Sequence, residues 1–581
     1  MKEGGQLFII IAISLSLAFL AFYTTNYFEY GGRLVVKQYK ADFYINGYLK
    51  ESYEYDVKGH YTMLYRTWNA PLVYNKSYFK PYVELLSINC SYIPYIKDYD
   101  GDVYISDESY SYEVYEKAYN NEAGCYNPDG YEKGVHTIGF AYKIYPPVHY
   151  DGNLYHMNIK FASEHVPYKN FEIVIHDNGS IADIFPHPPM KIEKNGNDYI
   201  LKGKSQKNGL IEVEFLLKKA NPLFLYTLGN VEEKTINANE KYYFHYKLAY
   251  FYSIFIKSLV FAFPAILLFI YFFYGRERKF VVPKYLSFVP KKRKPWQVNL
   301  LFKGDATKFD KHGFYATLLD LSLRKIIKIE DGNDVRIKII KKEGLDAYER
   351  KVIRFLEKYS FNGIFSVNDF NRRINEADTV GEITRLRDDL DALYKVRDAK
   401  EFIVNGRILM AKFLVIPIIL FMASLFLFIS YFNAYPILFS PFSFSFFLLI
   451  QFIIPIFAPS TLFGHWKKEY YKEKLEWDAF KNFLLDLAQL KKYGSKDISI
   501  WKEWLVYATA LGIGKKVAKE FKELNVNVPE AENLPYVYAY FAVIHSNANR
   551  KYSSMTSKGG SSFGGGFGGG GGFGGGGAGG R

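Results

Sequence analysis

Four long apolar stretches limit what this chain can fold into. They cover residues 7–23, 253–274, 408–432 and 436–458, and the first and last of them carry no charged residue. A helix needs about 20 apolar residues to cross the hydrocarbon core of a bilayer, and the last three stretches meet that length. The pattern therefore predicts a multi-pass α-helical membrane protein.

The stretch at residues 7–23 is a little shorter and fits either a transmembrane anchor or a signal peptide. The best small-x-small cleavage pattern, at residues 16–18, lies inside the apolar run. A cleavage site should follow the run instead. An uncleaved anchor is therefore the favoured interpretation, with residues 1–6 as a cytoplasmic N-terminus.

The positive charges predict the orientation, because loops rich in Lys and Arg stay in the cytoplasm. Residues 275–294 hold eight Lys or Arg against one Glu, and four lysines follow the last apolar stretch closely. We therefore expect a cell-membrane protein with residues 24–252 outside. Residues 275–407 and 459–581 would be inside, which makes the C-terminus cytoplasmic.

Two further features agree with this orientation. All Asn-x-Ser/Thr sequons, at Asn75, Asn89 and Asn178, lie in the segment assigned to the outside, and they are candidate N-glycosylation sites. Both cysteines, Cys90 and Cys125, lie there too, where a disulfide would persist. Whether they pair depends on a geometry that the sequence does not supply.

Residues 24–252 are expected to form an extracytoplasmic all-β, sandwich-like domain. Residues 171–185, 190–203 and 209–217 are rich in alternating apolar and polar positions, and Asn-Gly pairs occur among them. Asn-Gly favours the tight turn of a hairpin. Several strands at this spacing are typical of a β-sandwich.

An acidic run at residues 98–110 raises the question of a metal site. Asp98, Asp100 and Asp102 offer the hard oxygen ligands that calcium prefers. Counted from Asp98, however, the run has Val103 where an EF-hand requires glycine and Ser109 where it requires glutamate. A solvated acidic loop is therefore favoured. The histidines of this domain show no ligand spacing either, and we expect no metal and no cofactor.

The cytoplasmic segments are expected to be mainly helical. Residues 275–407 combine a basic juxtamembrane segment with a helix, a hairpin around Asp331-Gly332 and further helices, an order that resembles a winged helix. Residues 459–552 have the pattern of a second helical domain.

The winged-helix pattern raises a nucleic-acid function, which the charges disfavour. Residues 295–407 hold 22 Lys or Arg against 19 Asp or Glu, whereas a nucleic-acid binder needs its basic face on the docking domain. The positive excess lies beside the membrane instead, where anionic lipid head groups would meet it. The candidate lipid contacts are Arg276, Arg278, Lys279, Lys291, Lys292, Arg293 and Lys294.

The chain closes with the glycine-rich residues 553–581. Glycine has the most backbone freedom to lose on ordering, so we expect a disordered cytoplasmic tail. It is either a solvated ribbon with no role in the fold, or a tail whose Phe563, Phe567 and Phe573 act as weak contact points for a partner.

Residues 501–512 (WKEWLVYATALG) resemble the block LW-x-x-YL-x-YA-x-x-LG of the YciQ-like family of predicted membrane proteins, also called domain of unknown function 2207. Trp504 stands where that block often has tyrosine. The order of leader, outer β-domain, apolar spans, helical block and glycine-rich end is similar as well. The resemblance implies an architecture, and it brings no catalytic residues.

The leading functional hypothesis is a non-enzymatic envelope interaction, scaffold or signalling protein with unknown protein partners. A transporter or channel subunit is the first alternative, although the apolar stretches contain few polar residues to form a pathway. An ectoenzyme built on the outer domain is the second, although that domain contains no G-x-S-x-G, H-E-x-x-H or P-loop motif. The oligomeric state stays open.

Overall fold

The computed structural model describes residues 3–330, 334–396, 399–486, 498–524, 526, 528–556 and 575–581. The chain divides into two compact units, and each is described by itself. The first, called the β-unit below, comprises Ala12–Pro264, Val415–Gln451 and Gly566–Arg581. The second, called the helical unit, comprises Met1–Ile11, Ala265–Leu414 and Phe452–Gly565.

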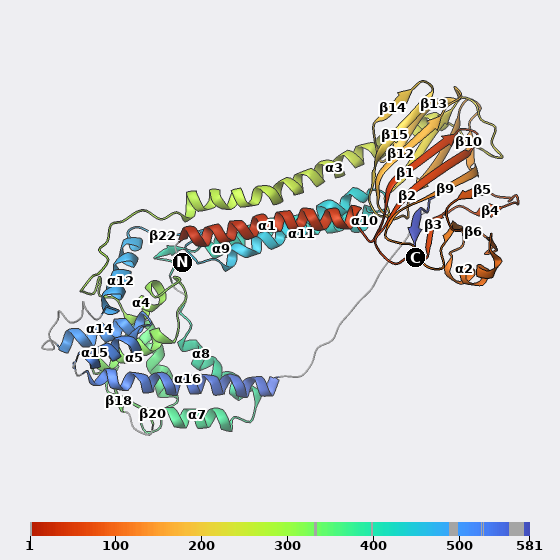
Figure 1. Cartoon of the computed structure of the whole chain (residues 1–581). Helices are drawn as coiled ribbons and strands as arrows, with labels where there is room; N and C mark the ends of the chain where they lie inside the picture. Colours follow the sequence, from red (N-terminus) through yellow and green to blue (C-terminus); the bar gives the residue numbers. More distant parts are fainter. Residues whose placement is uncertain are drawn as a thin grey trace. The chain divides into compact units, whose positions relative to one another are not determined.

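The described strands of the β-unit form three sheets (Figure 1). Their strand orders are β14-β15-β12-β1-β2-β9-β5-β4, β13-β16-β11-β10-β17 and β23-β3-β8-β6-β7. The strands are β1 Leu34–Tyr44, β2 Tyr48–Val57, β3 Met63–Thr67, β4 Leu72–Tyr74, β5 Tyr82–Asn89, β6 Ile93–Lys97, β7 Val103–Ile105, β8 Glu122–Tyr126, β9 Gly134–Tyr145, β10 Pro147–Tyr150, β11 Tyr155–Ala162, β12 Tyr168–His176, β13 Ile181–His187, β14 Ile192–Asn195, β15 Asp198–Ser205, β16 Ile211–Leu217, β17 Phe224–Thr227 and β23 Ala578–Gly580. A short helix, α2 (Ser111–Lys117), follows β7.

The first two sheets bury their apolar faces in one common core. The Phe43 ring of β1 lies 5.8 Å from the Phe161 ring of β11 and 5.9 Å from the Phe215 ring of β16. Alternating burial along β1 and β2 provides that face, as expected for strands with one side in a core. The β-rich domain predicted from the alternation is confirmed.

Four helices among the described residues are long and apolar enough to cross a membrane: Glu3–Tyr30, Val231–Gly275, Gly406–Tyr431 and Pro436–Phe457. They consist of α1 (Glu3–Tyr30), α3 (Val231–Ile270) with a π-helical turn, α9 (Gly406–Phe413) with α10 (Val415–Tyr431), and α11 (Phe439–Ile453) with two flanking 3₁₀ turns. The apolar stretch at residues 253–274 lies within the longer helical segment Val231–Gly275. The polar residues from Val231 onward continue the same helix, and apolar length reveals only its membrane part.

Polar side chains join these helices to one another. The Thr25 and Ser443 hydroxyls lie 2.7 Å apart, and Gln451 donates from Nε2 to the Ser14 carbonyl oxygen at 2.8 Å. Ser14, Thr25 and Gln451 are all buried. The apolar stretches therefore contain buried polar groups, and hydrogen bonds between the helices satisfy them.

The helical unit contains the remaining elements. Its helices are α4 Pro295–Phe302, α5 Lys311–Leu323, α6 Ala347–Lys358, α7 Val367–Glu376, α8 Val380–Leu393, α12 Tyr470–Leu484, α14 Ile498–Ala510, α15 Gly514–Glu523 and α16 Pro529–Thr556. The strands β18 Ile327–Glu330, β19 Arg336–Ile339 and β20 Ile364–Ser366 form one small sheet, and β21 Ile403–Val404 pairs with β22 His465–Trp466. The turn expected at Asp331-Gly332 lies outside the described residues, although the two strands that would flank it are present.

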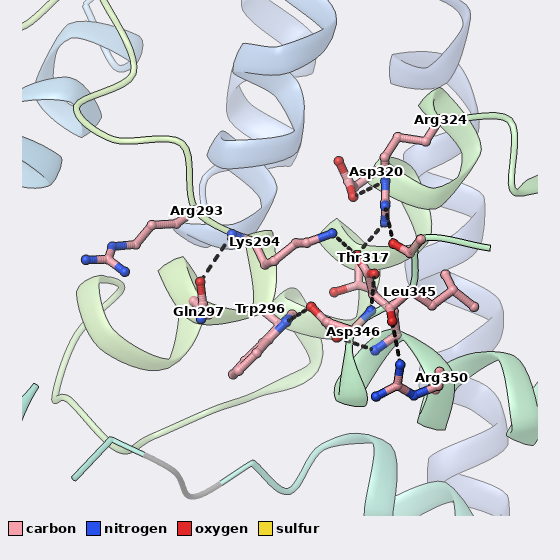
Figure 2. A network of polar contacts seen from close by, with 12 residues as sticks. Arg293, Lys294, Trp296, Gln297, Thr317, Asp320, Arg324, Leu345, Asp346 and Arg350 are labelled. Carbon is pink, nitrogen blue, oxygen red and sulfur yellow. Dashed lines mark hydrogen bonds and ion pairs between the residues drawn. The ribbon is translucent and has the colours of Figure 1, made fainter. Parts of the chain in front are cut away.

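A buried carboxylate, that of Glu349, organises the start of α6. Lys294 Nζ lies 2.8 Å from Glu349 Oε1, and the Arg324 guanidinium donates to the same oxygen. Asp346 caps the helix by accepting from the Glu349 backbone N–H at 2.8 Å, and it also accepts from Trp296 Nε1 at 2.8 Å (Figure 2). These polar groups from α4, α5 and α6 stabilise one another inside the helical unit.

The last seven residues, 575–581, contradict the expected disorder of the tail. Ala578–Gly580 forms the strand β23, which pairs antiparallel with β3 at the edge of the third sheet. Residues 553–556 belong to α16, and residues 557–574 lie outside the described residues. Disorder was expected from the backbone entropy of glycine alone. In the structure, a groove provides hydrogen bonds to the backbone of this segment.

Candidate functional site

The segment 575–581 lies in a groove of the β-unit that binds its backbone from two sides. On the β3 side, the Thr67 N–H donates to the Gly577 carbonyl at 3.1 Å, and the Arg581 N–H donates to the Met63 carbonyl at 3.0 Å. On the other side, the Val166 N–H donates to the Ala578 carbonyl at 3.0 Å. The segment is thus held as a strand between β3 and the loop before β12.

Further bonds hold both ends of the segment. The carbonyl oxygen of Arg581 accepts from the N–H groups of Thr62 and Met63, at 2.6 and 3.0 Å. At the other end, the Gly576 N–H donates to the Ser163 hydroxyl at 3.1 Å, and its carbonyl accepts from the Ser163 N–H at 3.0 Å. Backbone recognition of this kind provides affinity without reading side chains.

The groove leaves no room for side chains at most positions of the segment. A Cβ atom added to Gly576 would lie 2.1 Å from the Thr67 carbonyl oxygen, and one added to Gly579 would lie 2.5 Å from the Tyr65 ring. Gly577 and Gly580 are limited in the same way, at 2.4 and 2.6 Å. The methyl group of Ala578, by contrast, is accommodated and buried. The groove therefore selects glycine at four positions and accepts a small residue between them.

The side chain of Arg581 enters a pocket of its own. Its Nη2 lies 2.5 Å from Glu122 Oε2, and its Nη1 donates to the Lys117 carbonyl. The guanidinium carbon lies 4.0 Å from the centre of the Tyr119 ring and 4.4 Å from that of Tyr65. A planar cation bonded to a carboxylate and stacked between two aromatic rings is a geometry that arginine fills and lysine does not.

Glu122 is fully buried at the base of this pocket. It also accepts from the Tyr95 hydroxyl at 2.6 Å and from the Tyr119 N–H at 3.3 Å. Burial raises the pKa of Glu122, because it disfavours the charged form, while Arg581 and the Tyr95 hydrogen bond lower it in part. A buried carboxylate of this kind favours a cationic ligand.

A buried arginine, Arg66, supports the other end of the groove. Arg66 of β3 pairs with Glu51 of β2 at 3.3 Å, and Glu51 also accepts from the Tyr39 hydroxyl at 2.7 Å. With its remaining donors, Arg66 bonds the Phe161 carbonyl at 2.9 Å and the Gly575 carbonyl at 3.1 Å. The core of the β-unit thus contributes directly to the groove.

The groove widens into a hollow of about 630 Å³. Its walls include Trp68, Asn69, Tyr119, Asn121 and Asn208 beside the segment itself. These walls are largely polar and aromatic, which suits an extended peptide rather than an apolar small molecule.

Cys90 and Cys125 are joined by a disulfide in the structure, which resolves the alternative that the sequence left open. Cys125 lies on β8, the strand that also carries Glu122, and it pairs with Leu64 of β3. Cys90 follows β5 directly. The disulfide therefore ties the strand at the base of the arginine pocket to the eight-stranded sheet.

The acidic cluster considered as a metal site already holds a cation. Asp98, Asp100 and Asp102 come together, and Lys76 Nζ lies 2.7 Å from Asp98 and Asp100 and 3.7 Å from Asp102. The carboxylates raise the pKa of Lys76 through hydrogen bonds, so that it keeps its charge. The sequence could not reveal this arrangement, because Lys76 lies on another loop.

A second cluster has no counterpart in the sequence pattern. His187, Glu212 and Glu214 come together, with His187 Nδ1 3.5 Å from Glu212. Asn239 of α3 donates to Glu214 at 2.7 Å and lies 2.6 Å from His187 Nε2 through its amide oxygen. Because Lys160 also lies 3.6 Å from Glu212, the group acts as an ion-pair network that docks α3 on the sheet.

The three candidate glycosylation residues, Asn75, Asn89 and Asn178, are exposed on the β-unit. Asn75 follows β4, Asn89 ends β5, and Asn178 lies between β12 and β13. Exposure is what attachment of a glycan requires, and modification of these residues stays a prediction.

The seven candidate lipid contacts divide into two groups. Arg276, Arg278, Lys279, Lys291 and Lys292 are exposed. Arg293 instead bonds Glu473, with Nη2 2.6 Å from Oε2, and Lys294 pairs with Glu349. These last two residues are committed to the helical unit because their partners are buried carboxylates, so the basic stretch contributes fewer free charges than its sequence indicates.

The groove has no local signature in the sequence. Glu122 is one acidic residue among many, and Arg581 is a single cation after a run of glycines. That lone arginine was the available signal, because it is the only charged residue from 559 to 581. The expected contact points Phe563, Phe567 and Phe573 lie outside the described residues.

Residues 36–217 match the N-terminal domain, and residues 282–521 the C-terminal domain, of a family described as predicted membrane protein (DUF2207). No protein of curated function matches the chain. One solved structure with a weak likeness is that of a candidate protease from Parabacteroides distasonis ATCC 8503, at 13% identity and a TM-score of 0.16. The likeness spans 32% of this chain and 40% of that one, and a TM-score so low shows no common fold.

Proposed function

This chain belongs to the DUF2207 family of predicted membrane proteins, and from that premise we propose that its β-unit is a receptor for extended glycine-rich segments that carry an arginine. The protein would act by binding and not by catalysis. The proposal specifies which kind of ligand an interaction protein of this composition would bind.

The observation that carries the proposal is the pocket around Arg581. Backbone pairing alone would accept any extended chain that is narrow enough. The buried Glu122 and the two tyrosine rings add a requirement for one cationic, planar side chain at a fixed distance from the glycines. Two requirements at a fixed spacing give the specificity expected of a receptor site.

The proposal also includes an orientation. We infer that the β-unit strands lie outside the cell membrane and the helical unit inside, which the distribution of Lys and Arg supports. The exposed residues Arg276, Arg278, Lys279, Lys291 and Lys292 would then meet anionic lipid head groups. A receptor outside, joined by α3 to domains inside, has the layout of a scaffold or signalling protein.

A peptide-binding experiment tests the receptor function. The chain shortened by residues 575–581 is purified in detergent, and a fluorescent peptide of sequence GGGAGGR is titrated against it. We expect saturable one-to-one binding, because the emptied groove keeps Glu122 and the β3 edge. The control is GGGAGGK, which keeps the charge and loses the planar stacking.

Lysine should weaken binding by about tenfold, in the range of a lost cation–π stack and one lost guanidinium hydrogen bond. Absence of saturable binding by GGGAGGR would refute the receptor function. Equal binding of both peptides would refute the arginine pocket as its basis.

A further inference from the structure

We propose that in a membrane the groove does not bind this chain's own terminal segment, and that its occupant is a glycine-rich, arginine-bearing segment of a different protein on the same side as the β-strands. The inference rests on the receptor function proposed above. It follows from the path of the chain between the groove and residue 575.

Three apolar helices separate the β-strands from the terminal segment along the chain. They are α3, α10 and α11, and each belongs to a stretch long and apolar enough to cross a membrane. An odd number of crossings places the two ends of that path on opposite sides. The same parity holds if α10 and α11 form a hairpin that enters and leaves from one side, because α3 still crosses once.

Contacts inside the β-unit fix the direction of these helices. The Val231 N–H at the start of α3 donates to the Asp151 carboxylate at 2.9 Å, so α3 begins at the strands and leads away from them. Between α10 and α11, the Pro436 carbonyl accepts from Gln206 at 2.7 Å, and the Ala434 carbonyl accepts from Tyr242 at 3.3 Å.

The turn between α10 and α11 therefore lies at the strands, and α11 leads away from them as α3 does. Figure 1 shows α3 and α10 meeting the strands at the same end. Everything after α11 therefore follows, along the chain, a helix that leads away from the strands.

The segment would have to pass back through the bilayer to reach the groove in the same chain. Residues 557–574 consist mostly of glycine and lack the apolar length of a fifth span. Peptide groups that cross lipid outside a helix or a closed barrel stay without hydrogen bonds, which costs several kcal/mol for each group. A second copy of the chain in the same orientation has the same path and meets the same barrier.

The groove nevertheless has the features of a specific site. Its selection for glycine at four positions and for arginine at one describes the occupant: an extended segment with the pattern Gly-Gly-small-Gly-Gly-Arg, reachable from the side of the β-strands. This chain's own terminal segment carries the same chemistry and shows how such an occupant fits.

The experiment compares two proteins in two environments. The full chain and the chain shortened by residues 575–581 are each reconstituted in sealed proteoliposomes and also kept in detergent. Fluorescent GGGAGGR is added outside the vesicles. The accessible β-unit is quantified by labelling a Lys191→Cys variant of each protein with an impermeant reagent, since Lys191 is exposed.

In vesicles we expect both proteins to bind the peptide with affinities equal within about twofold, because the groove of the full chain is empty there. In detergent the full chain should bind at least tenfold more weakly, because no bilayer separates its own segment from the groove and a tethered competitor acts at an effective concentration in the millimolar range.

Three outcomes would count against these proposals in different ways. If the shortened chain binds in vesicles and the full chain does not, the groove holds its own segment and the inference is wrong while the receptor function stands. If neither protein binds in either environment, the receptor function itself fails. Equal binding by both proteins in detergent would also contradict the inference, since the segment would then not recognise the groove.

Discussion

Two buried carboxylates, Glu122 in the β-unit and Glu349 in the helical unit, differ in where their cations come from. Both are fully buried. Glu349 is met by Lys294 and Arg324, which belong to neighbouring elements of the same domain. Glu122 is met by Arg581, which is 459 positions away on a segment that only the groove holds.

The charge of Glu349 therefore has a structural role, whereas the charge of Glu122 would serve to bind a ligand. The cations of Glu349 are held by the packing of α4, α5 and α6, so that its charge is neutralised whenever the unit is folded. Glu122 is paired with a cation only when a ligand is present, because its other partners, Tyr95 and the Tyr119 N–H, are neutral. A buried carboxylate with a removable cation stores an unfavourable energy that binding relieves.

The largest effect is expected from removing the structural charge. Glu349→Ala leaves Lys294 and Arg324 without their common partner and breaks the capping of α6, which should cost about 3–5 kcal/mol of unfolding free energy. Tryptophan fluorescence during thermal unfolding reports this, since every Trp except Trp68 belongs to the helical unit. The control Glu343→Ala removes an exposed carboxylate, and an equal effect of the two changes would contradict the assigned role.

Glu122→Gln should instead affect ligand affinity and leave the unfolding free energy unchanged. In the chain shortened by residues 575–581 we expect no loss of unfolding free energy, because the change removes an unpaired buried charge. Affinity for the peptide GGGAGGR should fall about 100-fold, since a charged hydrogen-bonded pair is lost. Fluorescence anisotropy measures the affinity. Strong destabilisation of the empty chain would show that Glu122 is structural, like Glu349, and would remove the distinction.

A smaller effect is expected from single methyl groups on the ligand. Replacing the glycine equivalent to Gly579 by alanine places a Cβ against the Tyr65 ring, and overpacking at a fixed site costs about 1–3 kcal/mol, or roughly tenfold or more in affinity. Replacing the residue equivalent to Ala578 by glycine is the matched control and should change binding only slightly. If both peptides bind like the parent, steric selection is not a property of the groove.

The smallest effect concerns pH. Arg581 lowers the pKa of Glu122, because the guanidinium favours the charged carboxylate, and protonation of the carboxyl therefore opposes binding. Affinity should therefore be constant at alkaline pH and should fall as the pH drops and the Glu122 carboxylate becomes protonated. Titrations between about pH 5 and pH 8 measure this, and Glu122→Gln should abolish the dependence.

The sequence predicted those features that depend on neighbouring residues. Apolar length revealed the four candidate spans, and alternation with Asn-Gly pairs revealed strands such as β14 and β15, because the hydrophobic pattern and the turn are local. The apolar stretch at 253–274 did not reveal that α3 begins at Val231, because a helix can continue beyond its apolar part. Pairing of Cys90 with Cys125 stayed open because it depends on how β5 and β8 approach in space.

The groove could not be predicted in this way, because its parts come from distant positions. β23 and β3 are about 510 residues apart along the chain, and no local pattern relates them. The contact of Lys76 with three aspartates could not be predicted for the same reason, because Lys76 is distant from them along the chain. The glycine-rich end was interpreted from its entropy alone, and the compensating hydrogen bonds are provided by Thr67, Ser163 and Val166, which nothing in the tail specifies.

The lack of space at Gly576, Gly577, Gly579 and Gly580 would limit how the sequence of such a ligand can evolve. Glycine is the smallest residue, so every substitution there adds atoms where none fit, and no exchange is conservative. A substitution at one of these glycines, like lysine in place of the arginine, is therefore expected to weaken binding by about tenfold or more. A ligand of this kind would change by gain or loss of the whole motif, and related ligands would share an identical core even where the rest of their sequences have diverged completely.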